Sequence, residues 1–122
     1  MEVLVVDDDE IALDIYAAWL RAEGHEVTCV DGRGALVELA RKSWDVLLVD
    51  ILMPVVDGLE VIMAAKAVAR PPRIVAMSDN GIRSGWEYLR LAEVLGAELC
   101  LSKPLERQVV TWAVEPQAEA AA

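Results

Sequence analysis

Short apolar runs recur along this chain, and each is followed by a longer segment with apolar residues at helical spacing. The runs are rich in valine and leucine and lack the apolar-polar alternation of a sheet with one face in water. We therefore predict five strands buried on both faces, at Glu2–Val6, Glu26–Val30, Asp45–Val49, Arg73–Met77 and Glu98–Ser102. Because crossovers between parallel strands are right-handed, this order predicts an α/β fold, a doubly wound parallel sheet with helices on both sides.

A helix is predicted after each strand, at Ile11–Ala22, Ala35–Lys42, Leu59–Val68, Ser84–Leu95 and Glu106–Val114. In the first helix we expect an apolar stripe of Ile11, Ile15, Ala18 and Leu20 or Trp19.

The glycine-rich segment 31–34 is predicted to be a turn. A length of 122 residues suits one domain with one core. We place that domain at residues 1–115 and expect residues 116–122, which include Pro116 and four alanines, to form a flexible tail.

The chain is acidic, with 21 acidic and 11 basic residues and a formal charge of -10. This charge argues against direct nucleic-acid binding, because phosphate recognition needs a basic surface. No apolar run approaches membrane-spanning length, and no basic leader precedes the first strand. Cys29 and Cys100 lie in apolar runs without a metal or redox spacing, which predicts buried, reduced thiols. We therefore expect a cytoplasmic protein without nucleic-acid or membrane partners.

Polar side chains stand directly after four of the predicted strands. They are Asp7-Asp8, Asp50, Ser78 and Lys103-Pro104. If the strands are parallel neighbours, these groups collect at one edge of the sheet. That edge, at the carboxyl ends of the strands, is where open α/β sheets bind their ligands.

Three carboxylates at this edge, from Asp7, Asp8 and Asp50, would repel one another unless a cation lay between them. Mg²⁺ suits the position, because it prefers oxygen ligands and is usually held by a few carboxylates with phosphate oxygens and water. We predict Asp8 and Asp50 as direct ligands and Asp7 as a ligand through water. The plainer interpretation of an acidic residue after a strand is a helix N-cap, a position that Asp9 is predicted to fill.

Asp50 is the candidate nucleophile, because a carboxylate can accept a phosphoryl group as an acyl phosphate. The transfer depends mainly on positioning and charge neutralisation. Lys103 would neutralise one phosphoryl oxygen, and the Ser78 hydroxyl would donate a hydrogen bond to another. Taken singly, a solvated lysine and an ordinary loop serine are the plainer interpretations. Their joint placement after neighbouring strands favours the site.

The segments V-V-D-D-D-E, L-L-V-D-I-L-M-P-V-V-D-G, V-A-M-S and G-A-E-L-C-L-S-K-P-L together resemble the receiver domain of bacterial response regulators. The resemblance runs from about Val3 to about Val114 and is closest in kind to stand-alone, chemotaxis-regulator-like receivers. It implies a flavodoxin-like (βα)5 fold with strand order 2-1-3-4-5. It also implies that Asp50 takes phosphate from a phosphohistidine on a sensor histidine kinase or a histidine phosphotransfer protein.

The resemblance further implies that the backbone carbonyl of Leu52 completes the Mg²⁺ site and that the Lys103-Pro104 bond is cis. The protein would then be a two-component signalling switch that assists its own phosphorylation and dephosphorylation, not an enzyme. The pattern departs at Cys100, where Tyr or Phe is usual, and at Asp79, where a small residue is usual. Cys100 indicates either a switch built from other residues or a different output. Asp79 adds negative charge near the phosphate site, which predicts weaker binding or a side chain that turns away from the site.

Trp86 and Trp112 are predicted to point away from the core, on the fourth and fifth helices. Exposed aromatic residues often anchor partners, so we expect an output protein or a second copy to bind the face of helix four, strand five and helix five. The plainer interpretation is that both rings pack on their neighbours. His25 is predicted to be a solvated histidine and not a phosphate carrier.

Two other functions stay open. A receiver-like scaffold that binds partners without phosphorylation is compatible with the departures at Cys100 and Asp79. A phosphatase of the haloacid-dehalogenase type is suggested by the Asp7-x-Asp9 pair after an apolar strand. The short chain and the segment Asp50–Gly58 argue against the phosphatase.

Overall fold

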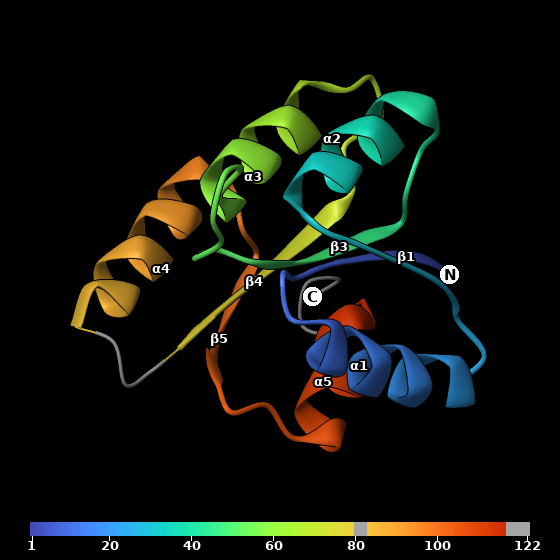
Figure 1. Cartoon of the computed structure of the whole chain (residues 1–122). Helices are drawn as coiled ribbons and strands as arrows, with labels where there is room; N and C mark the ends of the chain where they lie inside the picture. The colour runs from blue at the N-terminus through green and yellow to red at the C-terminus, as the bar shows by residue number, and fades with distance from the viewer. Residues whose placement is uncertain (80–82, 117–122) are drawn as a thin grey trace.

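The computed structural model describes residues 1–79 and 83–116, apart from the side chains of residues 83–86 and 88. Within this part of the chain a single parallel sheet has the order β2-β1-β3-β4-β5 (Figure 1). Its strands are β1 (Glu2–Val6), β2 (Glu26–Val30), β3 (Val46–Asp50), β4 (Arg73–Asp79) and β5 (Leu99–Lys103). The flavodoxin-like strand order is therefore confirmed.

Helices alternate with these strands along the chain. They are α1 (Glu10–Ala22), α2 (Gly32–Arg41), α3 (Gly58–Ala67), α4 (Arg83–Leu95) and α5 (Arg107–Val114). Figure 1 shows α1 and α5 together on one face of the sheet and α2, α3 and α4 on the other. The molecule is thus the predicted three-layer arrangement, with the sheet in the middle.

Three strands extend further than the apolar pattern predicts. β3 ends at Asp50, β4 at Asp79 and β5 at Lys103. In the sheet register, Asp50 pairs with Met77 and Asp79 pairs with Lys103. Asp50, Ser78 and Lys103 of the predicted site therefore lie within strands, whereas Asp7 and Asp8 follow β1. Ladder hydrogen bonds hold the backbones of the strand residues in place.

The prediction of a turn at residues 31–34 is wrong, because α2 begins at Gly32. Asp31 is its N-cap and accepts a hydrogen bond from the Gly34 N–H at 2.8 Å. Glycine is a poor helix former, which is why the composition suggested a turn. Gly32 is needed for close packing: a Cβ at this position would lie 2.5 Å from the carbonyl oxygen of Val56.

The predicted apolar stripe of α1 is also largely wrong. The buried side chains are Leu13, Tyr16, Ala17 and Leu20. Ile11 and Ile15 are 72% and 42% exposed. Both stripes fit a helical period. Packing against the sheet and α5 decides which of the two stripes is buried.

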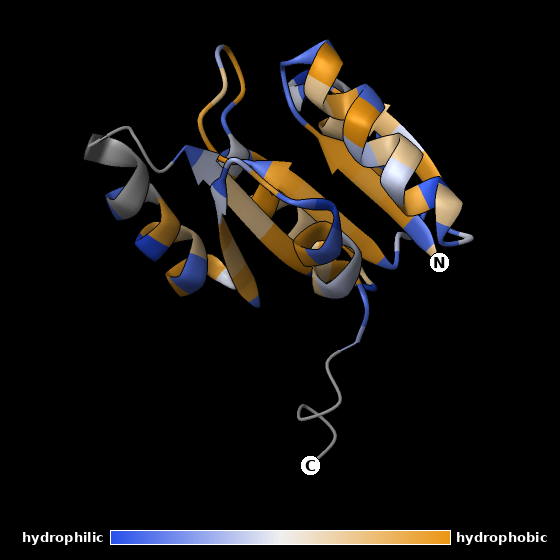
Figure 2. Ribbon diagram, turned by 90° about the horizontal axis from the view of Figure 1, so that it is seen from below, coloured by the Kyte–Doolittle hydropathy of each residue, from blue (hydrophilic) through white to orange (hydrophobic). Residues whose placement is uncertain are grey.

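β3 lies at the centre of the sheet, and all of its residues are buried. Leu47 and Val49 belong to the core under α2, α3 and α4, whereas Val46 and Leu48 belong to the core under α1 and α5. In Figure 2 the strands are mostly in the orange of hydrophobic residues, and Figure 1 shows the two layers of helices that cover them. Full burial of such a side chain contributes roughly 1.5–3 kcal/mol. Asp50 therefore stands at the end of the best-buried strand.

His25 is buried, at 8% exposure, which contradicts the predicted solvated position. Its Nδ1 lies 3.3 Å from the amino group of Met1. Its Nε2 lies 3.1 Å from Glu115 Oε1, without the alignment of a hydrogen bond. The ring lies just before β2, at the amino end of the sheet, because α1 and β2 are joined by a short, tight connection.

Cys29 and Cys100 are free thiols and are half-buried, less enclosed than predicted. No helix in the described ranges is both long and apolar enough to cross a membrane. The predicted flexible tail lies outside the described residues except for Pro116.

Candidate functional site

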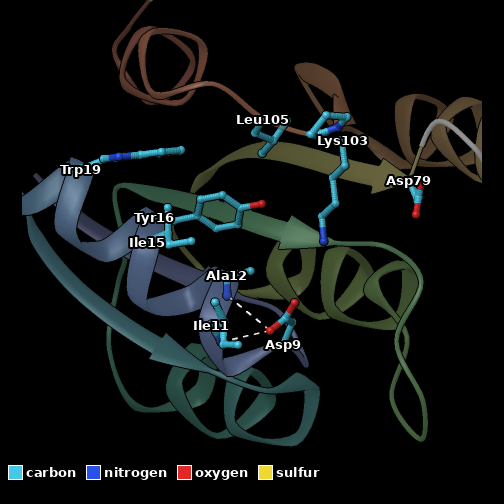
Figure 3. Close-up of a pocket in the computed structure, with 10 residues that line it drawn as sticks. Asp9, Ile11, Ala12, Ile15, Tyr16, Trp19, Asp79, Lys103 and Leu105 are labelled. Carbon is cyan, nitrogen blue, oxygen red and sulfur yellow. Dashed lines mark hydrogen bonds between the residues drawn. The ribbon is translucent and has the colours of Figure 1, made fainter.

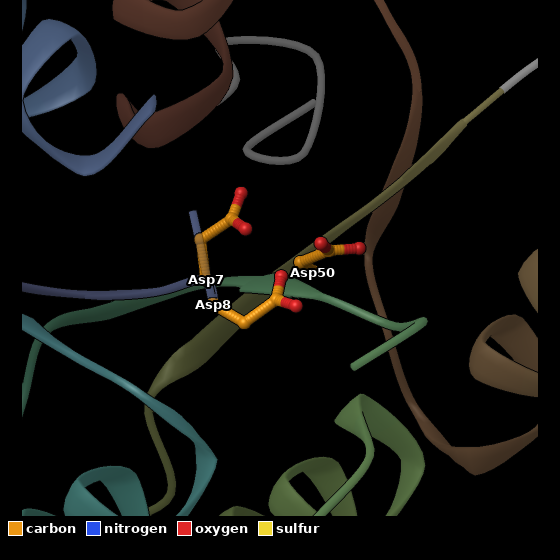
Figure 4. Close-up of side chains that lie close together, drawn as sticks. All are labelled: Asp7, Asp8 and Asp50. Carbon is orange, nitrogen blue, oxygen red and sulfur yellow. The ribbon is translucent and has the colours of Figure 1, made fainter. Parts of the chain in front are cut away.

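Three carboxylates meet at the carboxyl edge of the sheet. Asp7 and Asp8 follow β1, and Asp50 ends the neighbouring strand β3. One oxygen from each of the three lies within 4.8 Å of the others (Figure 4). Asp7 and Asp50 are buried, at 1% and 6% exposure, whereas Asp8 is exposed. The sheet topology thus brings together the acidic residues that the sequence placed after two separate strands.

Local hydrogen bonds set the conformation of the acidic segment. The Asp7 N–H donates to the carbonyl of Val30 at 3.2 Å, which continues the β1–β2 pairing. Asp7 Oδ1 accepts from the Asp9 N–H at 3.1 Å. Asp9 caps α1, as predicted, by accepting from the N–H groups of Ile11 and Ala12. Asp9 is therefore committed to the helix, while Asp8 is left facing outward beside Asp50.

Lys103 is the cation of the site. Its Nζ lies 2.9 Å from Asp7 Oδ2 and 3.2 Å from Asp50 Oδ2. Burial lowers the pKa of Lys103, but the two carboxylates outweigh burial and hold the pKa above its usual value. The ammonium is therefore charged at neutral pH. The Lys103-Pro104 bond that follows is cis, as predicted.

One lysine does not compensate for three carboxylates. Burial, followed by the charge of Asp7, raises the pKa of Asp50 to about 6 even though Lys103 opposes the shift. Burial and a hydrogen bond with Asp7 also raise the pKa of Asp8. The site therefore has too little positive charge for its acidic groups, which is the condition under which a cation binds.

Ser78 is fully buried in β4, the strand next to Asp50. Its register places it one residue beyond Met77, the partner of Asp50. Among the described residues its Oγ has no hydrogen-bond partner. A buried hydroxyl without a partner is costly, so this atom is available to a group that enters the site.

The loop after Asp50 is held close to the site. Asp50 Oδ1 accepts a hydrogen bond from the Leu52 N–H at 3.2 Å. Gly58 packs directly on the end of β3, since a Cβ there would lie 2.4 Å from the carbonyl oxygen of Asp50. Asp57 caps α3 by accepting from the Glu60 N–H at 3.0 Å. The role of the Leu52 carbonyl as a metal ligand stays a prediction.

A cleft of about 450 Å³ adjoins the site on the α1 side (Figure 3). Its apolar lining comes mainly from Ile11, Ile15 and Trp19 of α1 and from Leu105, while Lys103 and Asp79 lie at its polar end. The sequence interpretation missed this cleft because it assigned the two isoleucines to the core. The sequence did contain a signal for this cleft, because α1 carries two apolar stripes and only one of them can face the sheet.

The structure describes only some of the side chains that are predicted to transmit phosphorylation of Asp50 to another surface. The Cys100 thiol donates a weak hydrogen bond to the Leu89 carbonyl of α4, at 3.6 Å. Burial, and then the charge of Glu93, raise the pKa of Cys100 to about 11. Trp112 is 51% exposed. The predicted orientation of the Trp86 side chain lies outside the described residues.

The fold and these side chains define a flavodoxin-like domain with an acidic site at the carboxyl edge of its sheet. The model of the response regulator receiver domain matches residues 3–115. The chain belongs to this family, whose members are signalling domains of two-component systems.

Curated relatives and solved structures agree with this assignment. The chain is 41% identical over 107 residues to protein-glutamate methylesterase/protein-glutamine glutaminase 5 of Myxococcus xanthus, covering 85% of the chain and 30% of the relative. It is 39% identical to the sensory transduction protein RegX3 of Mycolicibacterium smegmatis, covering 80% of the chain and 40% of the relative. The chain therefore spans less than half the length of these relatives.

Among solved structures, the receiver domain of the sensor histidine kinase PA1611 from Pseudomonas aeruginosa PAO1 has a TM-score of 0.78 and 27% identity. The similarity covers 93% of this chain and 96% of that one. That receiver domain has a magnesium ion coordinated in its active-site cleft.

Proposed function

We propose that this protein is a phosphorylation-controlled switch in which Asp50 accepts a phosphoryl group from a phosphohistidine. The donor would be a sensor histidine kinase or a histidine phosphotransfer protein. The observation that carries the proposal is the placement of the buried Asp50 carboxylate beside Lys103 Nζ, at 3.2 Å, and within reach of two further carboxylates. If this site served only to stabilise the fold, neutral residues in place of these like-charged carboxylates would make the protein more stable.

The donor set fits Mg²⁺. Carboxylate oxygens are its preferred ligands, and the three oxygens within 4.8 Å of one another lack compensating charge. In the proposal Asp8 and Asp50 hold the ion directly, Asp7 holds it through water, and the Leu52 carbonyl provides another oxygen. When bound, the ion supplies positive charge to the phosphoryl oxygens. The magnesium in the PA1611 receiver domain supports this assignment.

In the transfer, an oxygen of Asp50 forms a bond to phosphorus while the phosphorus–nitrogen bond of the phosphohistidine breaks. The bonding electrons return to the imidazole, and Asp50 becomes an acyl phosphate. Lys103, already 3.2 Å from Asp50, would pair with one phosphoryl oxygen. The Ser78 hydroxyl, which has no partner among the described residues, would donate to another.

Phosphorylation would change the charge at Asp50, and this change would alter partner binding at another surface. We propose that the face of α4, β5 and α5 binds an output protein or a second copy. Exposed apolar residues occur on both of its helices, Leu91 and Val94 on α4 and Trp112 on α5. The bond from Cys100 to Leu89 links β5 to α4 within this face. The free thiols Cys29 and Cys100 fit a cytoplasmic location, where thiols stay reduced.

Incubation with acetyl phosphate and Mg²⁺, followed by intact-mass measurement, tests the central step. We expect one phosphoryl adduct on the wild type and on Asp57→Asn, whose carboxylate only caps α3. We expect no adduct on Asp50→Asn. An adduct that survives this substitution would place the acceptor elsewhere, and no adduct on the wild type would favour the scaffold function.

A further inference from the structure

The buried stripe of α1 contains one side chain with a polar group, Tyr16. It lies beside Leu13, Ala17 and Leu20 in this stripe and is only 7% exposed. The stripe packs in the core between the sheet, α1 and α5. Packing in such a core calls for an apolar side chain and not for a hydroxyl, and the hydroxyl of a buried tyrosine usually has a polar partner. The Tyr16 hydroxyl therefore needs an explanation beyond the fold.

The Tyr16 hydroxyl points towards the acidic site. Tyr16 lines the cleft of about 450 Å³ together with Lys103, whose side chain is 22% exposed. Figure 3 shows the hydroxyl directed along this cleft towards the Lys103 side chain. The core holds the Tyr16 ring, which also lies against the Trp19 ring, with 5.8 Å between the centroids and 48° between the planes. The fold therefore fixes the hydroxyl on the α1 side of the lysine.

The charges of the site act on this hydroxyl. Burial raises the pKa of Tyr16, and the charge of Lys103 opposes the shift. The charges of Asp7, Asp50 and Asp9 act in the same direction as burial. The hydroxyl is thus close enough for all four charges to affect it, and it keeps its proton at neutral pH. The oxygen of a neutral hydroxyl can accept a hydrogen bond from an ammonium group.

Two carboxylates occupy two of the three N–H donors of the Lys103 ammonium group. These donors are directed to Asp7 Oδ2 at 2.9 Å and to Asp50 Oδ2 at 3.2 Å. The lysine side chain also borders the cleft into which the Tyr16 hydroxyl points. Lysine has a flexible four-carbon stem, so an ammonium group held by the carboxylates alone can turn away from Asp50 into the cleft.

We propose that Tyr16 is a positioning residue for Lys103, and that its hydroxyl oxygen holds the third ammonium N–H through a water in the cleft. A bridging water makes a contact nearly as favourable as a direct hydrogen bond. The contact keeps the ammonium group beside Asp50, where it neutralises an oxygen of the incoming phosphoryl group. The effect on the phosphorylation rate rests on the proposed function, whereas the position of Lys103 can be measured without phosphorylation.

The first measurement follows the Lys103 side chain by NMR in the absence of a phosphodonor. The lysines of the chain are Lys42, Lys66 and Lys103, so ¹³C-labelled lysine gives few Cε signals, and Lys103→Arg assigns the one of interest. Tyr16→Phe keeps the ring in its core and removes the hydroxyl. We expect the relaxation of the Lys103 Cε to show greater mobility in this variant, with the other two lysines unchanged. Ile15→Val is the matched control, because it trims the wall of the same cleft and keeps the hydroxyl.

The second measurement is the rate of phosphorylation by acetyl phosphate with Mg²⁺, followed by intact mass. Tyr16→Phe should take phosphate about fivefold more slowly than the wild type, the effect of losing one hydrogen bond of ordinary strength. Ile15→Val should match the wild type both in this rate and in the mobility of Lys103.

Unchanged mobility of Lys103 in Tyr16→Phe would overturn the proposal, whatever the rate. So would equal phosphorylation rates of the wild type and Tyr16→Phe, or an equal loss in Ile15→Val, which would assign the effect to the shape of the cleft. A wild type that takes no phosphate would overturn the proposed function instead, and the mobility of Lys103 would still decide whether Tyr16 positions it.

Discussion

The two ends of the sheet arrange their charges differently. At the carboxyl end, Asp7 and Asp50 share Lys103 and Asp8 lies beside them, and burial and like charge raise the pKa of Asp50 to about 6. At the amino end, two ion pairs join different elements, Lys42 with Glu2 and Arg73 with Glu98. The His25 ring there lies 3.1 Å from Glu115.

The amino end of the sheet therefore stabilises the fold, whereas the carboxyl end has the charge imbalance of a binding site. Ion pairs at the amino end tie the starts of β1 and β4 to neighbouring elements. The carboxyl end retains repulsion between its carboxylates, which weakens the unliganded protein. Among the described residues, buried polar atoms without a hydrogen-bond partner occur at both ends, Ser78 Oγ at the carboxyl end and His25 Nε2 and Arg73 Nη2 at the amino end. Functional sites are commonly the places where a sequence departs from what stability alone would select.

The strongest test of the comparison is the same substitution at the two ends of β3. The pKa of the Asp50 carboxyl is raised from 3.8 to about 6 in the fold. Its ionisation therefore costs stability as pH rises from about 4 to 6, and the full cost, on the order of 3 kcal/mol, is present above pH 6. Asp50→Asn should add roughly this amount to the free energy of unfolding at pH 7.5 without divalent ions, measured by urea denaturation. Near pH 4 the gain should vanish.

The matched control is Asp45→Asn, just before β3. Asp45 Oδ2 accepts a hydrogen bond from the Glu2 N–H at 2.7 Å. Asparagine keeps an acceptor oxygen but not its charge, and the weaker bond should lower the free energy of unfolding by about 0.5–1 kcal/mol. If Asp50→Asn also destabilised the protein at pH 7.5, repulsion among the carboxylates at the carboxyl end would not weaken the fold.

A second test removes a cation at the amino end. Arg73 is mostly buried, donates from Nε to Glu98 at 2.9 Å and donates from Nη1 to the Ala113 carbonyl near the end of α5. Arg73→Ala should lower the free energy of unfolding by about 2 kcal/mol, because hydrogen bonds from a charged donor are lost. Thermal and urea denaturation measure the effect.

Glu98→Gln supplies the control for Arg73. The Glu98 side chain is 59% exposed, so this change should cost much less. Neither variant should alter the stabilisation by Mg²⁺. A change in that stabilisation would show that the two ends are coupled.

A third test adds the cation that the carboxyl end lacks. Mg²⁺ at ten times its dissociation constant should stabilise the wild type by about 1.4 kcal/mol, measured as a rise in melting temperature. Asp8→Asn should require a higher concentration for the same rise, because it removes one proposed ligand. Equal stabilisation of both proteins would contradict the role of Asp8.

The smallest effect is expected at the exposed pair of the amino end. Lys42 pairs with Glu2 and lies 4.5 Å above the ring of Trp44. Lys42→Met should lower the free energy of unfolding by only about 0.5 kcal/mol, because both charges are partly solvated. The difference should shrink in high salt if it is electrostatic. If the loss of stability in Lys42→Met were the same in high salt, we would assign it to the lost contact with Trp44.

Much of the fold could be predicted from the sequence because local pattern determined it. Uninterrupted apolar strands such as β3 indicated burial on both faces, and the alternation with helices then left few topologies. The site followed from position, since parallel strands bring residues after β1 and β3 to one edge. The caps at Asp9 and Asp57 were likewise predictable from residue type.

Other features of the fold could not be predicted, because several arrangements fit the local sequence pattern equally well. Two stripes of α1 fit a helical period, and only packing chose the one that contains Leu13 and Tyr16. The buried position of His25 depends on Met1 and Glu115, which are distant in sequence. The start of α2 at Gly32 depends on the close approach of Val56.

Local pattern is enough to establish which elements form, which strand ends carry polar groups and which family the chain resembles. How those groups interact depends on the assembled fold: Asp7 and Asp50 contact one lysine, Asp8 is exposed, and Ser78 is buried without a partner among the described residues. The left-handed backbone of Val55 likewise depends on the assembled fold. The physical reason is that propensity and periodicity act over a few neighbouring residues, whereas pKa shifts, strain and unmet hydrogen bonds arise from groups that meet only when the sheet assembles.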